Sequence, residues 1–282
     1  IWRMYPSTLK IDSGCVYINN ILIKHRDQYI KILGKASKSD VDSIKVNLNK
    51  VDLAYIFDVV NFKSVDFGGI TTGEVSVSGA LKNPELNSHL FVKDFKMNGG
   101  FLGDARIFGN WDNAQKGISI NANIGEKNLS NAHVHGYVWL GRKELSLNID
   151  ASNTRTKFIE YYVKSVASNI DGRATGHFRV YGTFHLLNVT GTGKVDAKFK
   201  INVLNTYFAL HDSVYLTENE IKLNNAKVSD LEGHTGHVTC AVYHQNFKNW
   251  NYKIDVQAND IVVYNTDESS DMSFYGKLYA TG

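Results

Sequence analysis

Three seven-residue segments that begin and end with glycine recur along this chain, and they constrain its fold most strongly. They are residues 73–79 (GEVSVSG), 176–182 (GHFRVYG) and 276–282 (GKLYATG). Their first glycines are 103 and 100 residues apart. Each segment alternates between two sets of side chains, as strands with one buried face do. A repeat of this length built from such strands predicts one elongated β architecture whose units pack on their neighbours.

The first two units align without a gap over their C-terminal parts, at the same offset of 103 residues. Matched apolar positions are Ile44, Val46 and Leu48 in the first unit and Leu147, Ile149 and Ala151 in the second. The third unit is shorter, and chance similarity between alternating strands is the alternative explanation. We therefore expect one continuous β domain over residues 1–282, with units near 1–79, 80–182 and 183–282. We also expect the chain to be a fragment of a longer protein.

The alternation predicts sheets with one apolar and one polar face, because successive side chains of a strand point to opposite sides. The framing glycines fall on the apolar face, where they let backbones approach or a strand bend. Two such sheets could bury their apolar faces against each other or leave an open trough, and the alternation does not distinguish these. The side chains expected to line such a trough are Val75, Val77, Phe178, Val180, Val195, Phe199, Ile201, Ile254, Val256 and Leu278.

Two short segments have helical rather than strand periodicity. Residues 53–60 and 158–166 carry apolar side chains at i, i+1, i+4 and i+5. In the first segment this stripe consists of Tyr55, Ile56, Val59 and Val60. Each segment precedes its glycine-framed strand at a similar distance. They are interpreted either as crossover helices that cover one end of a sheet or as plugs that lie in the trough.

Composition excludes several functional classes. The net charge is +3 and the basic residues are scattered, which disfavours a nucleic-acid-binding groove. No apolar run approaches the roughly 20 residues of a membrane-spanning helix, and no signal peptide opens the chain. The two cysteines, Cys15 and Cys240, lie far apart in strand-like contexts, so a disulfide cannot be argued from the sequence.

Candidate catalytic and metal-binding groups are sparse. His133 and His135 share a strand face, but the sequence identifies no further ligand beside them. A second histidine group and one acidic loop have no recognisable ligand spacing: His234, His237 and His244, and Asp267, Glu268 and Asp271. Nucleophile elbows, HExxH helices and phosphate-binding loops do not occur. We therefore expect a protein that is not an enzyme, with no metal and no cofactor.

The C-terminal region carries a resemblance to a known family. Its ordered series is LNTYF at 204–208, VYL at 214–216, EIKLNNAKVSD at 220–230, Gly233, VYHQNF at 242–247, YKIDVQANDIVVYNT at 252–266 and FYGKLYATG at 274–282. This series resembles the C-terminal part of the TamB family of translocation and assembly proteins, in the version of Bacteroidetes-type bacteria. The resemblance is strongest over residues 170–282. Cys240 departs from it, since glycine is expected at that strand position.

The resemblance implies a fold and a role. Family members form a β-taco, a U-shaped sheet with an apolar inner surface, and belong with the AsmA-like, bridge-like lipid transfer proteins. They are anchored in the inner membrane by an N-terminal helix, which would lie outside this fragment, and cross the periplasm. They work with an outer-membrane BamA-like or TamA-like barrel protein. They are implicated in phospholipid transport to the outer membrane and in the assembly of nascent outer-membrane proteins.

Three functional interpretations remain open at this point. The first is a periplasmic conduit that shields phospholipid acyl chains in an apolar β groove. The second is a strand-pairing chaperone that offers a sheet edge to nascent outer-membrane β-barrel proteins. The third is a structural or adhesive β-solenoid, which would have a closed, dry core. An isolated fragment with an exposed trough could also form a homodimer that covers it, because large apolar patches seldom stay in contact with water.

Overall fold

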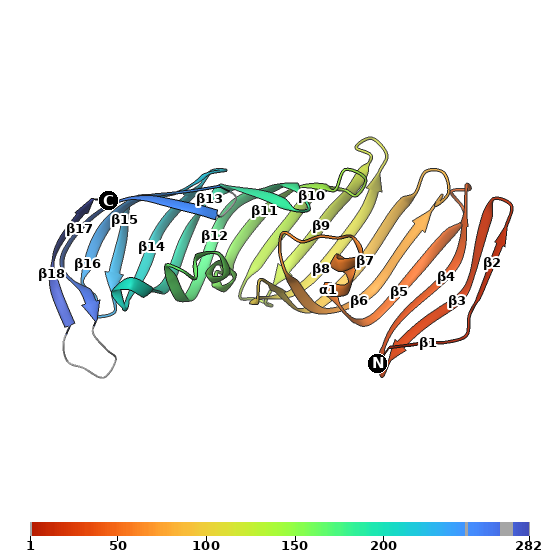
Figure 1. Cartoon of the computed structure of the whole chain (residues 1–282), viewed down its shortest axis with the longest axis horizontal. Coiled ribbons are helices and arrows are strands. Elements are labelled where there is room, and N and C mark those ends of the chain that lie inside the picture. Colours follow the sequence, from red (N-terminus) through yellow and green to blue (C-terminus); the bar gives the residue numbers. More distant parts are fainter. Residues whose placement is uncertain (1, 246–247, 266–272, 282) are drawn as a thin grey trace.

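The computed structural model describes residues 2–245, 248–265 and 273–281. About 71% of the chain is strand and 7% is helix, and the strands form one long antiparallel sheet that is not closed. Figure 1 shows this sheet as an elongated row of tilted strands, with the two short helices on one side of it. The expected all-β, elongated and open fold with short helices is therefore confirmed.

The sheet is a meander in which each strand from β2 to β18 pairs with the next strand in the chain. β1 and β2 pair with opposite ends of β3. The strands are β1 (Arg3–Met4), β2 (Thr8–Asp12), β3 (Cys15–His25), β4 (Gln28–Ser37), β5 (Ser43–Asp52), β6 (Phe67–Ser78), β7 (Glu85–Met97), β8 (Gly100–Asp112), β9 (Gly117–Gly125), β10 (Asn131–Trp139), β11 (Glu144–Arg155), β12 (Ala167–Thr183), β13 (Leu186–Ile201), β14 (Thr206–Leu216), β15 (Glu220–Asp230), β16 (Thr235–Gln245), β17 (Lys248–Asn265) and β18 (Ser273–Thr281).

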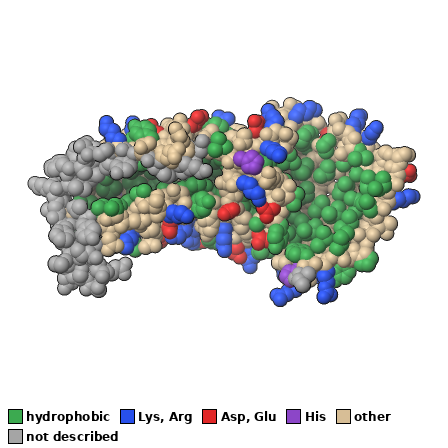
Figure 2. Space-filling model, in the orientation of Figure 1, with side chains coloured by type: hydrophobic (Ala, Val, Ile, Leu, Met, Phe, Trp, Pro, Cys, Tyr) green, Lys and Arg blue, Asp and Glu red, His purple; other side chains and the backbone are tan. Residues whose placement is uncertain are grey.

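Recurrent β-bulges bend these strands. A bulge inserts an extra residue, which bends its strand and increases the local twist. Three bulges hold a non-glycine residue in the left-handed conformation, and its N–H donates to a threonine hydroxyl on the next strand. The pairs are Lys50 with Thr72 at 3.1 Å, Asn153 with Thr175 at 2.9 Å and Asn225 with Thr239 at 3.1 Å. Bulges in many of the strands bend the sheet around a hollow, which Figure 2 shows.

The first two units share local structure as well as sequence. The Lys50–Thr72 and Asn153–Thr175 hydrogen bonds lie 103 residues apart, which is the offset of the glycine-framed segments. A helical segment follows each of these two bulges. The first is α1 (Leu53–Val59), and the second is a 3-10 turn, η1 (Lys157–Ile159), continued by α2 (Glu160–Val163). Residues 266–272 of the third unit lie outside the described residues.

The α1 helix lies in the hollow of the sheet. Leu53 is 2% exposed and packs against Val92, Phe95 and Ala105 of β7 and β8. The predicted stripe on this helix was wrong in part, since Tyr55 and Val59 are exposed. Leu53 starts the buried face, and Ile56 and Phe57 continue it, because side chains at i, i+3 and i+4 lie on one side of a helix. In the part of the chain that the structure describes, neither helix has the length to span a membrane.

Candidate functional site

Strand register brings the predicted trough residues onto one face of the sheet. Residues opposite each other in an antiparallel pair point to the same side. Val75 lies opposite Val46, Val180 opposite Leu147 and Phe199 opposite Phe208. We call this side the inner face. Half-buried side chains of the predicted set on it are Val75, Val77, Phe178, Val180, Val195, Phe199 and Ile201.

Three predicted residues belong to the last two strands. Ile254 and Val256 of β17 lie opposite Cys240 and Val238 in β16, and Leu278 of β18 lies opposite Ala258. Their backbone therefore continues the inner face. Their side chains lie outside the described residues.

The inner face is open at its N-terminal end. Several inner side chains of β2–β6 are buried, among them Ala36, Leu48 and Val51. We call the following inner side chains of these strands the open section: Leu9, Ile11, Val16, Ile18, Ile21, Ile23, Ile30, Ile32, Ile44, Val46, Val75 and Val77. All of them are half-buried or exposed, and Leu9 and Ile11 are 52% and 72% exposed. Figure 2 shows this region as a hollowed, almost continuous apolar surface on the right of the molecule. Monomeric soluble proteins rarely leave apolar patches of this kind uncovered unless they bind something.

The central part of the trough is filled by the protein itself. We call α1 and the connection at 60–66 the plug. Phe62 is 7% exposed and packs against Leu145 of β11 and Phe184 in the turn between β12 and β13. The N–H of Lys63 donates to the carbonyl of Phe184 at 3.2 Å. Val180 packs around the same cluster.

The C-terminal part of the trough is covered by β17. Beyond Ala258 this strand no longer pairs with β16, although it continues to pair with β18, and its end packs over β14 and β15. Ile261 is 3% exposed and contacts the cluster of Leu210 and Val228. Val195 and Phe199, both predicted trough residues, pack around that cluster. They are therefore core residues in this arrangement.

Asp230 holds this cover in place. Its side chain is 1% exposed, and its Oδ2 accepts the N–H of Val262 at 3.0 Å and the imidazole of His234 at 3.0 Å. Its Oδ1 accepts the N–H groups of Glu232 and His234. Burial raises the pKa of this carboxyl, but the hydrogen bonds outweigh burial, so its pKa lies below the usual value. The carboxylate therefore links β15 to the end of β17.

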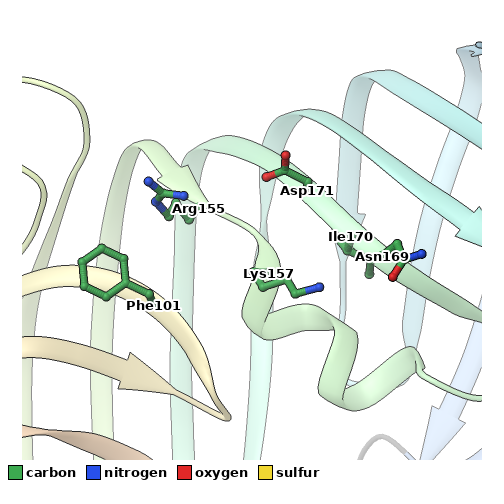
Figure 3. Close-up of a pocket in the computed structure, with 6 residues that line it drawn as sticks. All are labelled: Phe101, Arg155, Lys157, Asn169, Ile170 and Asp171. Atoms are coloured by element: carbon green, nitrogen blue, oxygen red, sulfur yellow. The ribbon is translucent and has the colours of Figure 1, made fainter.

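A shallow surface pocket lies between β8 and β12 (Figure 3). Its lining includes two cationic side chains, Arg155 and Lys157, which raises the question of anion binding. Arg155 donates to both carboxylate oxygens of Glu126, at 2.7 and 3.0 Å, and lies over the ring of Phe101. Lys157 is paired with Glu160 at 2.6 Å. Because both cations already have carboxylate partners, this pocket is not a candidate anion site.

One pair of predicted histidines gains a third neighbour in the structure. His133 and His135 lie on the outer face, as expected, and the register adds Asp150 of β11 beside them. Sequence reasoning missed this residue because it is distant in the chain.

The group of His234, His237 and His244 is not brought together. His234 bonds to Asp230, His237 is an exposed residue of β16 opposite Lys227, and His244 is 4% exposed. Asp267, Glu268 and Asp271 lie outside the described residues. Cys15 and Cys240 are free thiols, and burial raises the pKa of Cys240.

No known protein family, no curated protein and no solved structure matches this chain.

Proposed function

We propose that this chain is a periplasmic segment of a TamB-like protein that shields phospholipid acyl chains in its apolar trough. The observation that carries the proposal is the open section, where one face of an unclosed sheet leaves a row of isoleucine and valine side chains only half-buried, with Leu9 and Ile11 exposed at its end. The resemblance of residues 170–282 to the TamB family supports the same role. The full-length protein would be anchored in the inner membrane by a segment outside this fragment.

The physical chemistry of the open section suits an acyl chain. Each CH₂ group kept out of water contributes about 0.8 kcal/mol. Ile21, Ile32 and Val46 lie opposite one another on β3, β4 and β5, so apolar contact runs across successive strands. Many equivalent contacts allow a chain to slide along the trough without one deep energy minimum.

The plug lies between the open section and the C-terminal half of the trough. A lipid chain that enters at the open section meets α1 and Phe62 before it reaches the C-terminal half of the trough. Passage along the whole fragment therefore requires the plug to move aside. In this proposal a BamA-like or TamA-like barrel protein in the outer membrane is the partner, and nascent outer-membrane proteins are assembled with it.

The test compares two variants with the same change of charge on neighbouring residues of β6. Val77→Asp places a carboxylate on the inner face, and Ser76→Asp places it on the outer face, since the two residues point to opposite sides. Val77 is half-buried and lies outside the four buried clusters. Purified protein is extracted with organic solvent, and bound phospholipid is measured by mass spectrometry.

We expect near-stoichiometric phospholipid in the wild type and in Ser76→Asp, and a loss of at least about tenfold in Val77→Asp, because an unpaired carboxylate in an apolar site is costly. Equal lipid content in the two variants would refute the trough as the binding site. A homodimer without lipid would show that a second copy covers the open section.

A second candidate function rests on the free edge of β2. All five residues of this strand are exposed, and it pairs with β3 on one side only among the described residues. Such an edge can accept another strand by backbone hydrogen bonding. A photo-crosslinker at Lys10 should capture a purified, unfolded outer-membrane barrel protein, whereas one at Lys24 of β3 should not. Val77→Asp should leave this capture unchanged, which separates the two functions.

A further inference from the structure

A cluster of possible metal ligands lies on the outer face of the sheet, opposite the trough. His133 and His135 come from β10, and His133 is directly opposite Asp150 of β11. The Nδ1 atoms of His133 and His135 are 3.9 and 3.8 Å from Oδ2 of Asp150. One donor atom from each of the three residues lies within 4.8 Å of the others. The two imidazole rings are stacked, with centroids 5.2 Å apart.

We propose that His133, His135 and Asp150 form a binding site for a divalent transition-metal ion of the Zn²⁺ type. Zinc binds imidazole nitrogen and carboxylate oxygen at about 2.0–2.2 Å, usually in tetrahedral geometry. Two donors at that distance from a tetrahedral ion are about 3.4 Å apart. The two histidine–aspartate separations of 3.8 and 3.9 Å approach this value, and the donor atoms of the two histidines lie within 4.8 Å of each other, so side-chain rotations can complete the site.

A second observation concerns His135. Its Nδ1 atom is shielded from solvent and has no hydrogen-bond partner among the described residues. Leaving a shielded polar atom without a partner is unfavourable. A metal ion held between His135 and Asp150 would satisfy it.

His177 of β12 supports the site from outside. It lies opposite Asp150 on the other side of β11, and its Nδ1 is 2.6 Å from Oδ1 of that carboxylate. The oxygen that faces His133 and His135 is the other one, Oδ2. Metal-ligating carboxylates are commonly held in this way by a hydrogen-bonded neighbour. The side chains of His133, His135 and Asp150 are 37–45% exposed, so water or a group from another molecule can complete the coordination.

Isothermal titration with zinc chloride on the whole chain tests this proposal. We expect one ion per chain, with about 100-fold weaker binding in Asp150→Asn and His135→Asn. His177→Ala should lower the zinc affinity by about 10–100-fold, as is usual when the hydrogen-bond partner of a metal ligand is removed. The matched control is His211→Asn, since His211 makes a single pair with Asp196 on the same face at 2.9 Å. That variant should bind zinc as the wild type does.

Two results would overturn the proposal. One is equal loss of affinity in His211→Asn and Asp150→Asn, because that would indicate non-specific binding to surface histidines. The other is binding that survives both Asp150→Asn and His135→Asn unchanged. X-ray absorption of the zinc complex should report two imidazole ligands. Circular dichroism checks that each variant is folded. If Asp150→Asn is unfolded, the zinc affinity of His135→Asn tests the proposal instead.

Discussion

Replacing Phe62 by alanine should detach the plug from the trough. The Phe62 ring is 7% exposed and lies 5.3 Å from the ring of Phe57, 5.8 Å from that of Phe67 and 5.4 Å from that of Phe184. Burying a side chain of this size contributes about 1.5–3 kcal/mol, and each aromatic pair adds about 0.5–1.5 kcal/mol. Truncations of buried phenylalanine typically cost about 3–5 kcal/mol. We expect a loss in that range.

This loss should fall mainly on plug docking, because Phe62 bridges the connection at 60–66 to β11 and to the turn between β12 and β13. Since about 1.4 kcal/mol is a factor of ten in an equilibrium constant, the population with an undocked plug should rise about 100-fold or more. Hydrogen-exchange mass spectrometry should show faster exchange over residues 53–66 and unchanged exchange in β3 and β4. Lipid uptake should increase, since more of the inner face becomes accessible.

The control is Phe108→Ala on the outer face of β8. Phe108 is 37% exposed, and its one ring contact among the described residues is with His89, at 4.6 Å, so its truncation should cost about 1 kcal/mol and leave plug exchange unchanged. Equal changes in exchange over residues 53–66 in the two variants would contradict the assigned role of Phe62. A uniform rise in exchange along the chain in Phe62→Ala would also contradict it, because the plug would then undock only when the whole protein unfolds.

Two other predictions concern stability. The lowered pKa of Asp230 means that its contribution is present above the unfolded pKa of about 3.9 and is lost as the pH falls through the lower folded pKa. Acid denaturation should therefore be shallower below about pH 4 in Asp230→Asn than in the wild type, and parallel curves would contradict this. A Cβ on Gly73, where φ is +153°, would lie 2.1 Å from the carbonyl oxygen of His89. Gly73→Ala should lower the unfolding free energy by about 1–3 kcal/mol, whereas Gly141→Ala, which meets no atom within 4 Å, should change it by less than about 0.5 kcal/mol, as thermal melts can measure.

The face of each strand was predictable from the sequence because side-chain direction in a strand is a local property with period two. Val75, Phe178 and Phe199 were assigned to one face, and the register places them there. Glycine at a framing position was also informative. A Cβ on Gly176 would lie 2.3 Å from the carbonyl oxygen of Thr192, which is the close backbone approach that the motif indicated.

The candidate metal site could be predicted only in part from the sequence. His133 and His135 were recognised as neighbours on one face, since they are two residues apart. Asp150 became their partner only through the β10–β11 register, and His177 only through the next pair of strands. Register follows from turn geometry and packing together, so neither residue could be assigned from spacing in the chain.

By itself, the sequence determined an elongated all-β protein with an apolar face, a repeat of about 100 residues and short helical segments, because alternation and glycine position are local signals. Only the tertiary structure decided which parts of that face are accessible. Phe62 fills the centre and Ile261 covers the C-terminal part, while β2–β6 remain open. Plug and cover depend on contacts between residues far apart in the chain, as between Phe62 and Leu145. Such contacts require a sheet that is bent into a trough, and the register of distant strands decides that shape.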